Sequence, residues 1–264
     1  MSVLTDGLNP QQLAAVKHSG SPLLVVAGAG SGKTRVLTRR VAYLLAERNV
    51  APYEVLAITF TNKAAGEMKE RVTHLVGDRA KMMWVSTFHS ACVRILRREA
   101  ALLGYTNSFT IYDQSDSLRL VTLVMRDLNL DAKRYAPRAV AALISQAKNE
   151  LLGPADYLNQ SKDHFQEIVA QVFAIYQKRL SAANSMDFDD LIAKSVEVMQ
   201  RFPECRAKYR SRFKHILVDE YQDTNHAQYV LIKELVGSEQ EGFPPAELCV
   251  VGDADQSIYA FRGA

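Results

Sequence analysis

The sequence predicts an α/β fold in which a parallel sheet carries a phosphate-binding loop and an all-helical domain is inserted into the chain. Apolar runs alternate with helical patterns over the first ninety residues, and strand-like runs return only after position 212. The stretch between, 91–211, is almost wholly helical in pattern. We therefore expect an α/β domain made of residues 1–90 and 212–264, and a helical domain made of residues 91–211.

Five apolar runs bounded by turn residues are typical of buried parallel strands: Pro22–Ala27, Glu54–Thr59, Met83–Thr87, His215–Val218 and Glu247–Val251. Apolar residues at three- and four-residue spacing predict helices at Arg35–Arg48, Lys63–Val76, Asp116–Leu128, Pro137–Asn149, Phe165–Ala183 and Asp187–Gln200. One stretch, Gly237–Ala246, has the glycines, prolines and acidic residues of a loop.

Composition sets limits on the partners and on the compartment. The formal net charge of the 264 residues is only +3, so any nucleic-acid contact must come from local residues rather than from an overall basic field. Three cysteines without a CxxC pair fit a reducing compartment, and we expect a cytoplasmic protein. No basic start precedes an apolar stretch, and no segment approaches the ~20 apolar residues that cross a bilayer. We expect neither export nor a membrane partner.

A glycine-rich loop follows the first predicted strand and leads into a helix, which is the context that a P-loop requires. It consists of Ala27, Gly28, Ala29, Gly30, Ser31, Gly32, Lys33 and Thr34, with alanine at position 27 where the general pattern has glycine. Backbone N–H groups and the helix N-terminus would enclose phosphate oxygens. Lys33 would reach the terminal phosphates of ATP, and Thr34 would ligate Mg²⁺.

Two adjacent carboxylates, Asp219 and Glu220, follow the fourth predicted strand. Asp219 would hold Mg²⁺, and Glu220 would orient or deprotonate the water that attacks the γ-phosphate. Hydrolysis of ATP needs the second carboxylate, whereas a small-molecule kinase does not. The alternative is that both acids only cap the next helix, Thr224–Val236.

Two signatures, Asp219–Asn225 and Val251–Ala264, resemble those of superfamily 1 DNA helicases of the UvrD/PcrA/Rep type. The resemblance extends to Leu8, Asn9 and Gln12 and to the runs Thr59–Ala65, Ser86–Ser90 and Met186–Leu191. It implies a RecA-like ATP-binding domain and the N-terminal half of such an enzyme, in a form like that of actinobacterial members. A second RecA-like domain with its own insertion would be absent from this sequence.

The resemblance also implies residue roles. Gln12 would read the adenine edge, Arg35 would lie along the base, and Gln256 would contact the γ-phosphate. The DNA contacts would be Phe60, Asn62, His89, Tyr259, Phe261 and Arg262. Tyr259 and Phe261 are two residues apart, so in an extended segment both rings lie on one face and bases could stack on them. Phe261 stands where many members have tryptophan, which would make the platform weaker.

The implied activity is that of an ATP-dependent helicase that moves 3′ to 5′ along single-stranded DNA in repair or replication. Its partners would be single-stranded DNA, single-strand/duplex junctions, the missing C-terminal helicase domains and repair proteins. Residues 1–264 alone would be nearly inactive, because the arginines that stabilise the transition state belong to the missing domain.

Other function classes stay open at this point. A P-loop kinase or GTPase is one, although no guanine-reading motif is present, and an ATP-gated DNA-binding module without turnover is another. Phe60 could be a core residue rather than a platform, and Arg94, Arg97 and Arg98 could track phosphates or simply solvate a helix face. The histidines lack the spacing of a zinc site.

Overall fold

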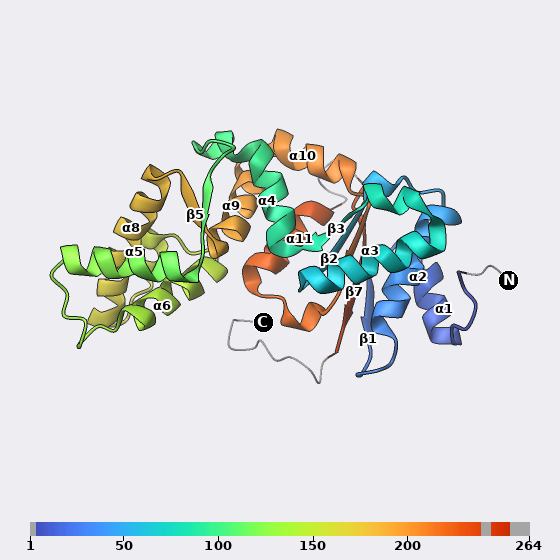
Figure 1. The fold of residues 1–264 in the computed structure, drawn as a ribbon, viewed down its shortest axis with the longest axis horizontal. Helices are drawn as coiled ribbons and strands as arrows, with labels where there is room; N and C mark the ends of the chain where they lie inside the picture. Colours follow the sequence, from blue (N-terminus) through green and yellow to red (C-terminus); the bar gives the residue numbers. More distant parts are fainter. Residues whose placement is uncertain (1–3, 239–243, 254–264) are drawn as a thin grey trace.

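A central parallel sheet lies in one part of the molecule, and a group of helices extends from it (Figure 1). The structure, a computed structural model, describes residues 4–238 and 244–253. The sheet contains β1 (Leu23–Val26), β2 (Val55–Thr59), β3 (Trp84–Thr87), β6 (His215–Val218) and β7 (Glu247–Gly252). These strands confirm the five predicted ones. Their spatial order is β1-β7-β6-β2-β3, and every neighbouring pair is parallel.

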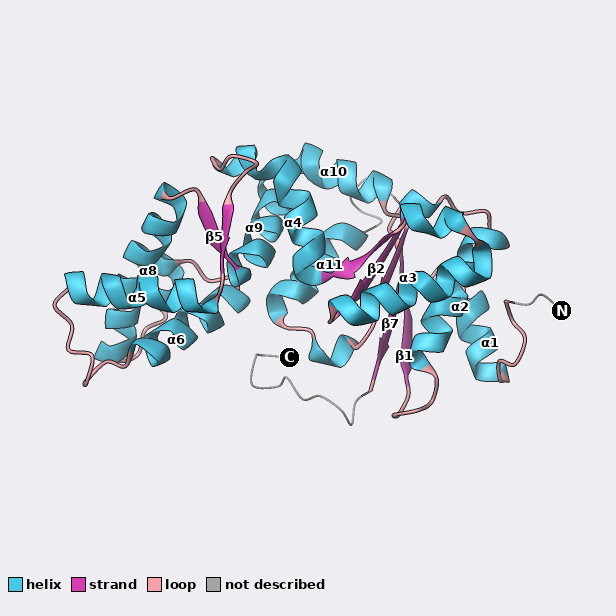
Figure 2. Cartoon of the chain, in the orientation of Figure 1, coloured by secondary structure: helices cyan, strands magenta, loops and turns pink. Residues whose placement is uncertain are grey.

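The predicted helices are confirmed with small shifts in their bounds, and the helix Pro137–Asn149 begins and ends at the predicted residues. The helices are α1 (Pro10–Lys17), α2 (Lys33–Ala46), α3 (Asn62–Val76), α4 (Phe88–Glu99), α5 (Gln114–Asp127), α6 (Pro137–Asn149), α7 (Pro154–Asn159), α8 (His164–Ala182), α9 (Phe188–Arg201), α10 (Pro203–Arg212) and α11 (His226–Val236). Figure 2 shows how helices dominate the part of the molecule away from the large sheet. No helix in the described ranges is both long and apolar enough to span a bilayer.

A second, two-stranded parallel sheet was not expected. It pairs β4 (Thr110–Tyr112) with β5 (Ser185–Asp187), so the prediction that strands return only after position 212 is wrong. Three residues are too few to produce a recognisable alternation of apolar and polar side chains. This small sheet places β5, which leads directly into α9, beside β4, which follows α4 in the chain.

The expectation that all five strands are buried is also wrong for β1. Leu24 and Val26 are 61% and 60% exposed, whereas every residue of β2 and β6 is buried. The reason is position, because β1 lies at the end of the strand order and β2 and β6 lie inside it. An apolar run does not reveal which strand will be at the edge of a sheet.

Alternate residues of the strands pack into different hydrophobic clusters. On β2, Val55 and Ala57 pack with α2 and α3, whereas Leu56 and Ile58 pack with α4, α9 and α11. A third cluster joins α5, α6 and α8 away from the large sheet. Helices α4 and α9 therefore share a core with the sheet, although most of their residues belong to the segment 91–211. The three cysteines are buried free thiols within the chain.

Candidate nucleotide site and nucleic-acid pocket

Most of the predicted site residues in the described ranges lie where the strands of the large sheet end. Because all five strands are parallel, their carboxyl ends lie at one edge, where α/β proteins bind ligands. The loops after β1, β7 and β6 carry the phosphate loop, Asp253 and Asp219. Phe60 follows β2, and His89 lies in the first turn of α4, directly after β3. Neighbouring strands are about 4.8 Å apart, so the ends of β1 and β3 lie roughly 20 Å from each other.

The phosphate loop has the shape that its glycines allow. Gly30 and Gly32 have φ angles of 72° and 86°, in the left-handed region that residues with a Cβ avoid. A Cβ added at Gly28 or Gly30 would meet no atom within 4 Å, so the loop borders open space. Helix α2 begins at Lys33 without a side-chain cap, which leaves its first N–H groups available to an anion. This geometry fits a bound phosphate chain.

The ammonium of Lys33 folds back over the loop. Its Nζ donates to the carbonyl oxygens of Ala27 at 2.7 Å and Gly28 at 3.1 Å, and it pairs with Asp253 Oδ2 at 3.0 Å. The side chains of Lys33 and Asp253 are 10% and 3% exposed. A terminal phosphate that reaches Lys33 would therefore replace an existing partner rather than meet a solvated charge.

The two predicted Mg²⁺ ligands lie together. Asp219 directly follows β6 and is 4% exposed, and Thr34 Oγ1 donates to its Oδ2 at 3.4 Å. Burial, followed by the neighbouring Glu220, raises the pKa of Asp219 to about 6. A hydroxyl and a carboxylate on one side suit Mg²⁺, which takes its remaining ligands from phosphate oxygens and water.

Glu220 has a left-handed backbone, with φ 50° and ψ 44°, which is uncommon for a residue with a side chain. The helix that follows is capped by Asn225 and Gln228, so the alternative that Asp219 and Glu220 serve only as its cap is wrong. Gln222 Nε2 donates to Glu220 Oε2 at 2.9 Å, and Gln222 Oε1 accepts from Asp253 N at 2.9 Å. Gln222 thus spans the ends of β6 and β7, a role that sequence reasoning missed.

The two residues predicted to bind adenine flank the loop. Gln12 Nε2 donates to the Ser31 carbonyl at 2.9 Å, and Arg35 Nη2 donates to the Asp6 carbonyl at 3.4 Å. A Cβ at Gly32 would lie 3.1 Å from Gln12 Nε2 and 3.9 Å from Arg35 Cβ. Arg35 also borders a pocket of about 520 Å³, which is lined by Arg35, Thr38, Arg39, Glu70, Arg71, His74 and Leu75.

Three predicted DNA contacts line one pocket of about 530 Å³, formed by Phe60, Thr61, Asn62, Thr87, His89, Ser90, Val93, Ile111, Phe188 and Leu191. The ring of Phe60 meets buried Phe88 edge-on at 5.8 Å and remains partly exposed. Sequence reasoning missed Phe188, which is 48% exposed and lies edge-on to His89 at 5.7 Å. Its signal was the signature Met186–Leu191, to which we assigned no residue roles.

The remaining predicted residues fall into two groups. Gln256, Tyr259, Phe261 and Arg262 lie outside the described residues. The arginines of α4 cover aromatic rings, with Arg94 at 4.0 Å from the centre of Trp84 and Arg97 at 3.9 Å from that of Phe109. Arg97 also donates to the Phe109 carbonyl at 2.6 Å. These contacts favour a structural role for Arg94 and Arg97.

Comparison with known proteins shows which sequences this chain resembles. Residues 8–264 match the UvrD/REP helicase N-terminal domain. Over 99% of its length the chain is 63% identical to ATP-dependent DNA helicase UvrD1 of Mycobacterium tuberculosis and 59% identical to that of Mycobacterium leprae. It is 52% identical over its whole length to ATP-dependent DNA helicase PcrA of Staphylococcus aureus. The chain spans about a third of the length of these relatives, 34–35%.

Proposed function

We propose that this chain, which belongs to the UvrD/REP helicase family, is the ATP-binding and single-strand-binding part of an ATP-dependent DNA helicase that moves 3′ to 5′ in repair or replication. The observation that carries the proposal is the shared sheet edge. The loops after β1, β7 and β6 form a phosphate-binding end, and the carboxyl ends of β2 and β3 border an aromatic pocket that α4 and α9 complete. Both sites therefore lie along the same edge of one sheet.

At the phosphate-binding end, the residues from Ala27 to Thr34 bind the phosphates of ATP through backbone N–H groups and through Lys33. The positive φ angles of the loop and the uncapped start of α2 support this assignment. Gln12 hydrogen-bonds the adenine edge, and Arg35 lies along the base. Binding moves the Lys33 ammonium from Asp253 to the terminal phosphates.

Thr34 and Asp219 hold Mg²⁺, which neutralises charge on the phosphate oxygens when bound. Glu220 accepts a proton from the water that attacks the γ-phosphate. Gln222, through its 2.9 Å hydrogen bond, holds the Glu220 carboxylate in place for that step. We also propose that Gln256 contacts the γ-phosphate.

At the pocket, Phe60, Asn62, His89 and Phe188 contact single-stranded DNA, with bases against the aromatic rings. Stacking contributes roughly 1–3 kcal/mol per base and is indifferent to sequence, which suits movement along arbitrary DNA. Tyr259, Phe261 and Arg262 extend this surface. The partners are single strands, junctions with duplex, further helicase domains and repair proteins.

The same proposal covers organisation and location. Residues 1–90 and 212–264 form the RecA-like domain, and residues 91–211 form the helical one, with α4 and α9 packed against the sheet. Buried free cysteines support a reducing, cytoplasmic location. Transition-state arginines from a second domain would be needed for fast hydrolysis, so residues 1–264 alone hydrolyse ATP slowly and unwind nothing.

The test measures two affinities on residues 1–264: a fluorescent ATP analogue with Mg²⁺, and a labelled oligo-dT strand by anisotropy. Lys33→Ala should abolish nucleotide binding and leave oligo-dT binding unchanged. Phe188→Ala should weaken oligo-dT binding by about tenfold and leave nucleotide binding unchanged. Tyr229→Ala is the matched control, because Tyr229 on α11 is 47% exposed but lies outside the pocket.

Three results would count against the proposal. A chain that binds neither ligand removes it altogether. A chain that binds oligo-dT as tightly after Phe188→Ala removes the pocket from the DNA path. Phosphorylation of a small-molecule acceptor in place of release of inorganic phosphate would instead indicate a P-loop kinase.

A further inference from the structure

One amide side chain contacts both the loop that carries Glu220 and the helix that carries Phe188. Asn149 is the last residue of α6, and its Oδ1 accepts from Asn225 Nδ2 at 2.7 Å. Its Nδ2 donates to the Ser145 carbonyl at 2.9 Å and to Asp189 Oδ1 at 3.3 Å. A single residue from a third element therefore lies between the two proposed ligand sites.

On the nucleotide side, Asn225 fixes the far end of the segment that begins with Glu220. Asn225 is 8% exposed, and its Oδ1 caps α11 by accepting from Gln228 N at 3.0 Å. Within the segment, Asp223 N donates to the Glu220 carbonyl at 3.0 Å. Thr224 N likewise donates to the Tyr221 carbonyl at 3.1 Å, so consecutive hydrogen bonds connect the segment and a shift at Asn225 would be transmitted toward Glu220.

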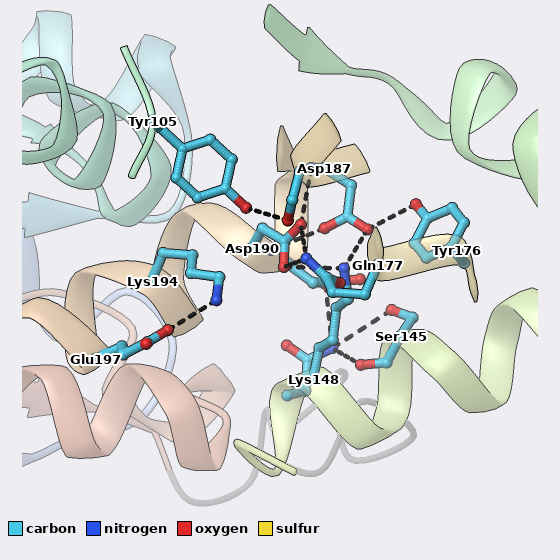
Figure 3. A network of polar contacts seen from close by, with 12 residues as sticks. Tyr105, Ser145, Lys148, Tyr176, Gln177, Asp187, Asp190, Lys194 and Glu197 are labelled. Carbon is cyan, nitrogen blue, oxygen red and sulfur yellow. Dashed lines mark hydrogen bonds and ion pairs between the residues drawn. The ribbon is translucent and has the colours of Figure 1, made fainter. Parts of the chain in front are cut away.

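On the pocket side, α6 and α9 are held together by a buried ionic cluster. Lys148 Nζ lies 2.6 Å from Asp187 Oδ2 and 2.9 Å from Asp190 Oδ1, and the Lys148 side chain is 3% exposed. Figure 3 shows Lys148 pointing between these two carboxylates, with Tyr176 donating to Asp187 at 2.7 Å. Breaking such a pair is costly, so the end of α6 follows the start of α9.

The ammonium of Lys148 keeps its charge at neutral pH. Burial lowers the pKa of the Lys148 ammonium, but the attraction of Asp187 and Asp190 raises it by more, so its pKa lies above the ordinary value. Asp189, the residue after Phe188, is held at the start of α9 by the hydrogen bond from Asn149 Nδ2. The position of the Phe188 ring at the pocket is thus tied to Asn149.

We propose that Asn149 is a positioning residue that couples the two sites, so that nucleotide and single-stranded DNA alter each other's affinity through the contacts from Asn225 to Asn149 to Asp189. This inference rests on the proposed function, because it needs both ligands to bind. Coupling of this kind is reciprocal: the factor by which nucleotide changes DNA affinity equals the factor by which DNA changes nucleotide affinity.

The test uses residues 1–264 and the same two probes. Oligo-dT affinity is measured with and without saturating non-hydrolysable ATP analogue and Mg²⁺, and nucleotide affinity with and without oligo-dT. The parent should show a factor of about five or more in both directions. In Asn149→Ala the factor should fall below about two, while each affinity measured alone stays within about twofold of the parent.

Three further variants make the result specific. Asn149→Asp retains the acceptor for Asn225 but loses the donor to Asp189, and Asn225→Asp retains the cap of α11 but loses the donor to Asn149. Both should lose the coupling, and Asn225→Asp decides the matter if Asn149→Ala does not fold. Asn159→Ala, at the exposed end of α7, should keep it.

The outcomes separate this inference from the proposed function. Coupling that survives in both Asn149→Ala and Asn225→Asp overturns the inference alone. A parent that binds both ligands without any coupling does the same. A parent that binds neither ligand removes the proposed function, and the inference falls with it.

Discussion

Removing the ammonium of Lys148 should be among the most destabilising single changes in this chain. Lys148→Met keeps most of the side-chain volume but leaves the carboxylates of Asp187 and Asp190 without the cation that lies 2.6 Å and 2.9 Å from them. Their remaining side-chain donors are Tyr176 OH to Asp187 and Gln177 Nε2 to Asp190. The backbone N–H of each aspartate also donates to the carboxylate of the other, and all of these donors are neutral. Two buried negative charges would then face each other.

The expected loss is about 3–5 kcal/mol of the free energy of unfolding near neutral pH, the cost of removing one partner from a buried ion pair. This is a large share of the roughly 5–15 kcal/mol that stabilises a typical domain. Without the ammonium, burial raises the pKa of the two carboxyls above their unfolded values. The variant therefore gains stability as the pH falls and these groups take protons, and its deficit should shrink at about pH 5.

The measurement is urea unfolding of the parent and the variant, followed by circular dichroism at about pH 7.5 and about pH 5. Lys194→Met is the matched control, because Lys194 pairs with Glu197 at 2.7 Å but both side chains are partly exposed. It should cost less than about 1 kcal/mol at either pH. The reasoning is refuted if Lys148→Met costs no more than Lys194→Met, or if its deficit does not change with pH.

Three other predictions concern single residues. Glu220→Gln should lower the single-turnover rate of ATP hydrolysis by roughly 100-fold or more while ATP-analogue affinity stays the same, and an unchanged rate would exclude Glu220 as the base. Gln222→Leu, which loses the bonds to Glu220 and to the Asp253 backbone, should slow the same step by about tenfold; equal loss of nucleotide affinity would contradict a positioning role. Burial lowers the pKa of His215, although the charge of Glu247 opposes this shift. As the pH drops through about 6.5, the histidine therefore takes up a proton in the unfolded chain before it does so in the folded one, and the free energy of unfolding should fall by at most about 1.4 kcal/mol per pH unit. His215→Gln should flatten that slope in urea titrations across this range, and an equal slope in both proteins would assign it to other groups.

The sequence predicted the features of the fold that depend on neighbouring residues. The runs that became β2, β6 and β7 and the pattern that became α6 lie where periodicity placed them, and the glycines of the phosphate loop have the conformations that glycine permits. Edge position could not be predicted in this way, because the exposure of Leu24 depends on which strand lies beside β1.

Contacts between distant segments were the other limit. Phe188 stands at the start of a helix, where an aromatic residue is usually buried, and its exposure depends on how α9 meets β3 and α4. The bond between Asn149 and Asn225 joins residues 76 positions apart. Asn225 ends a recognised signature and caps α11, but nothing in that local pattern indicates that Asn149 is its partner. Gln222 stood within a recognised signature, but its two partners are visible only once β6 and β7 are adjacent.

The ion pair between Lys33 and Asp253 bears on how long a nucleotide stays bound. Because the lysine already has an anionic partner 3.0 Å away, an arriving phosphate gains only the difference between two attractions. A departing product is likewise replaced at once by an internal carboxylate, so the ammonium is never left desolvated and alone. At the proposed ATP site, this competition should shorten the residence time of bound nucleotide and favour the exchange of product for fresh nucleotide.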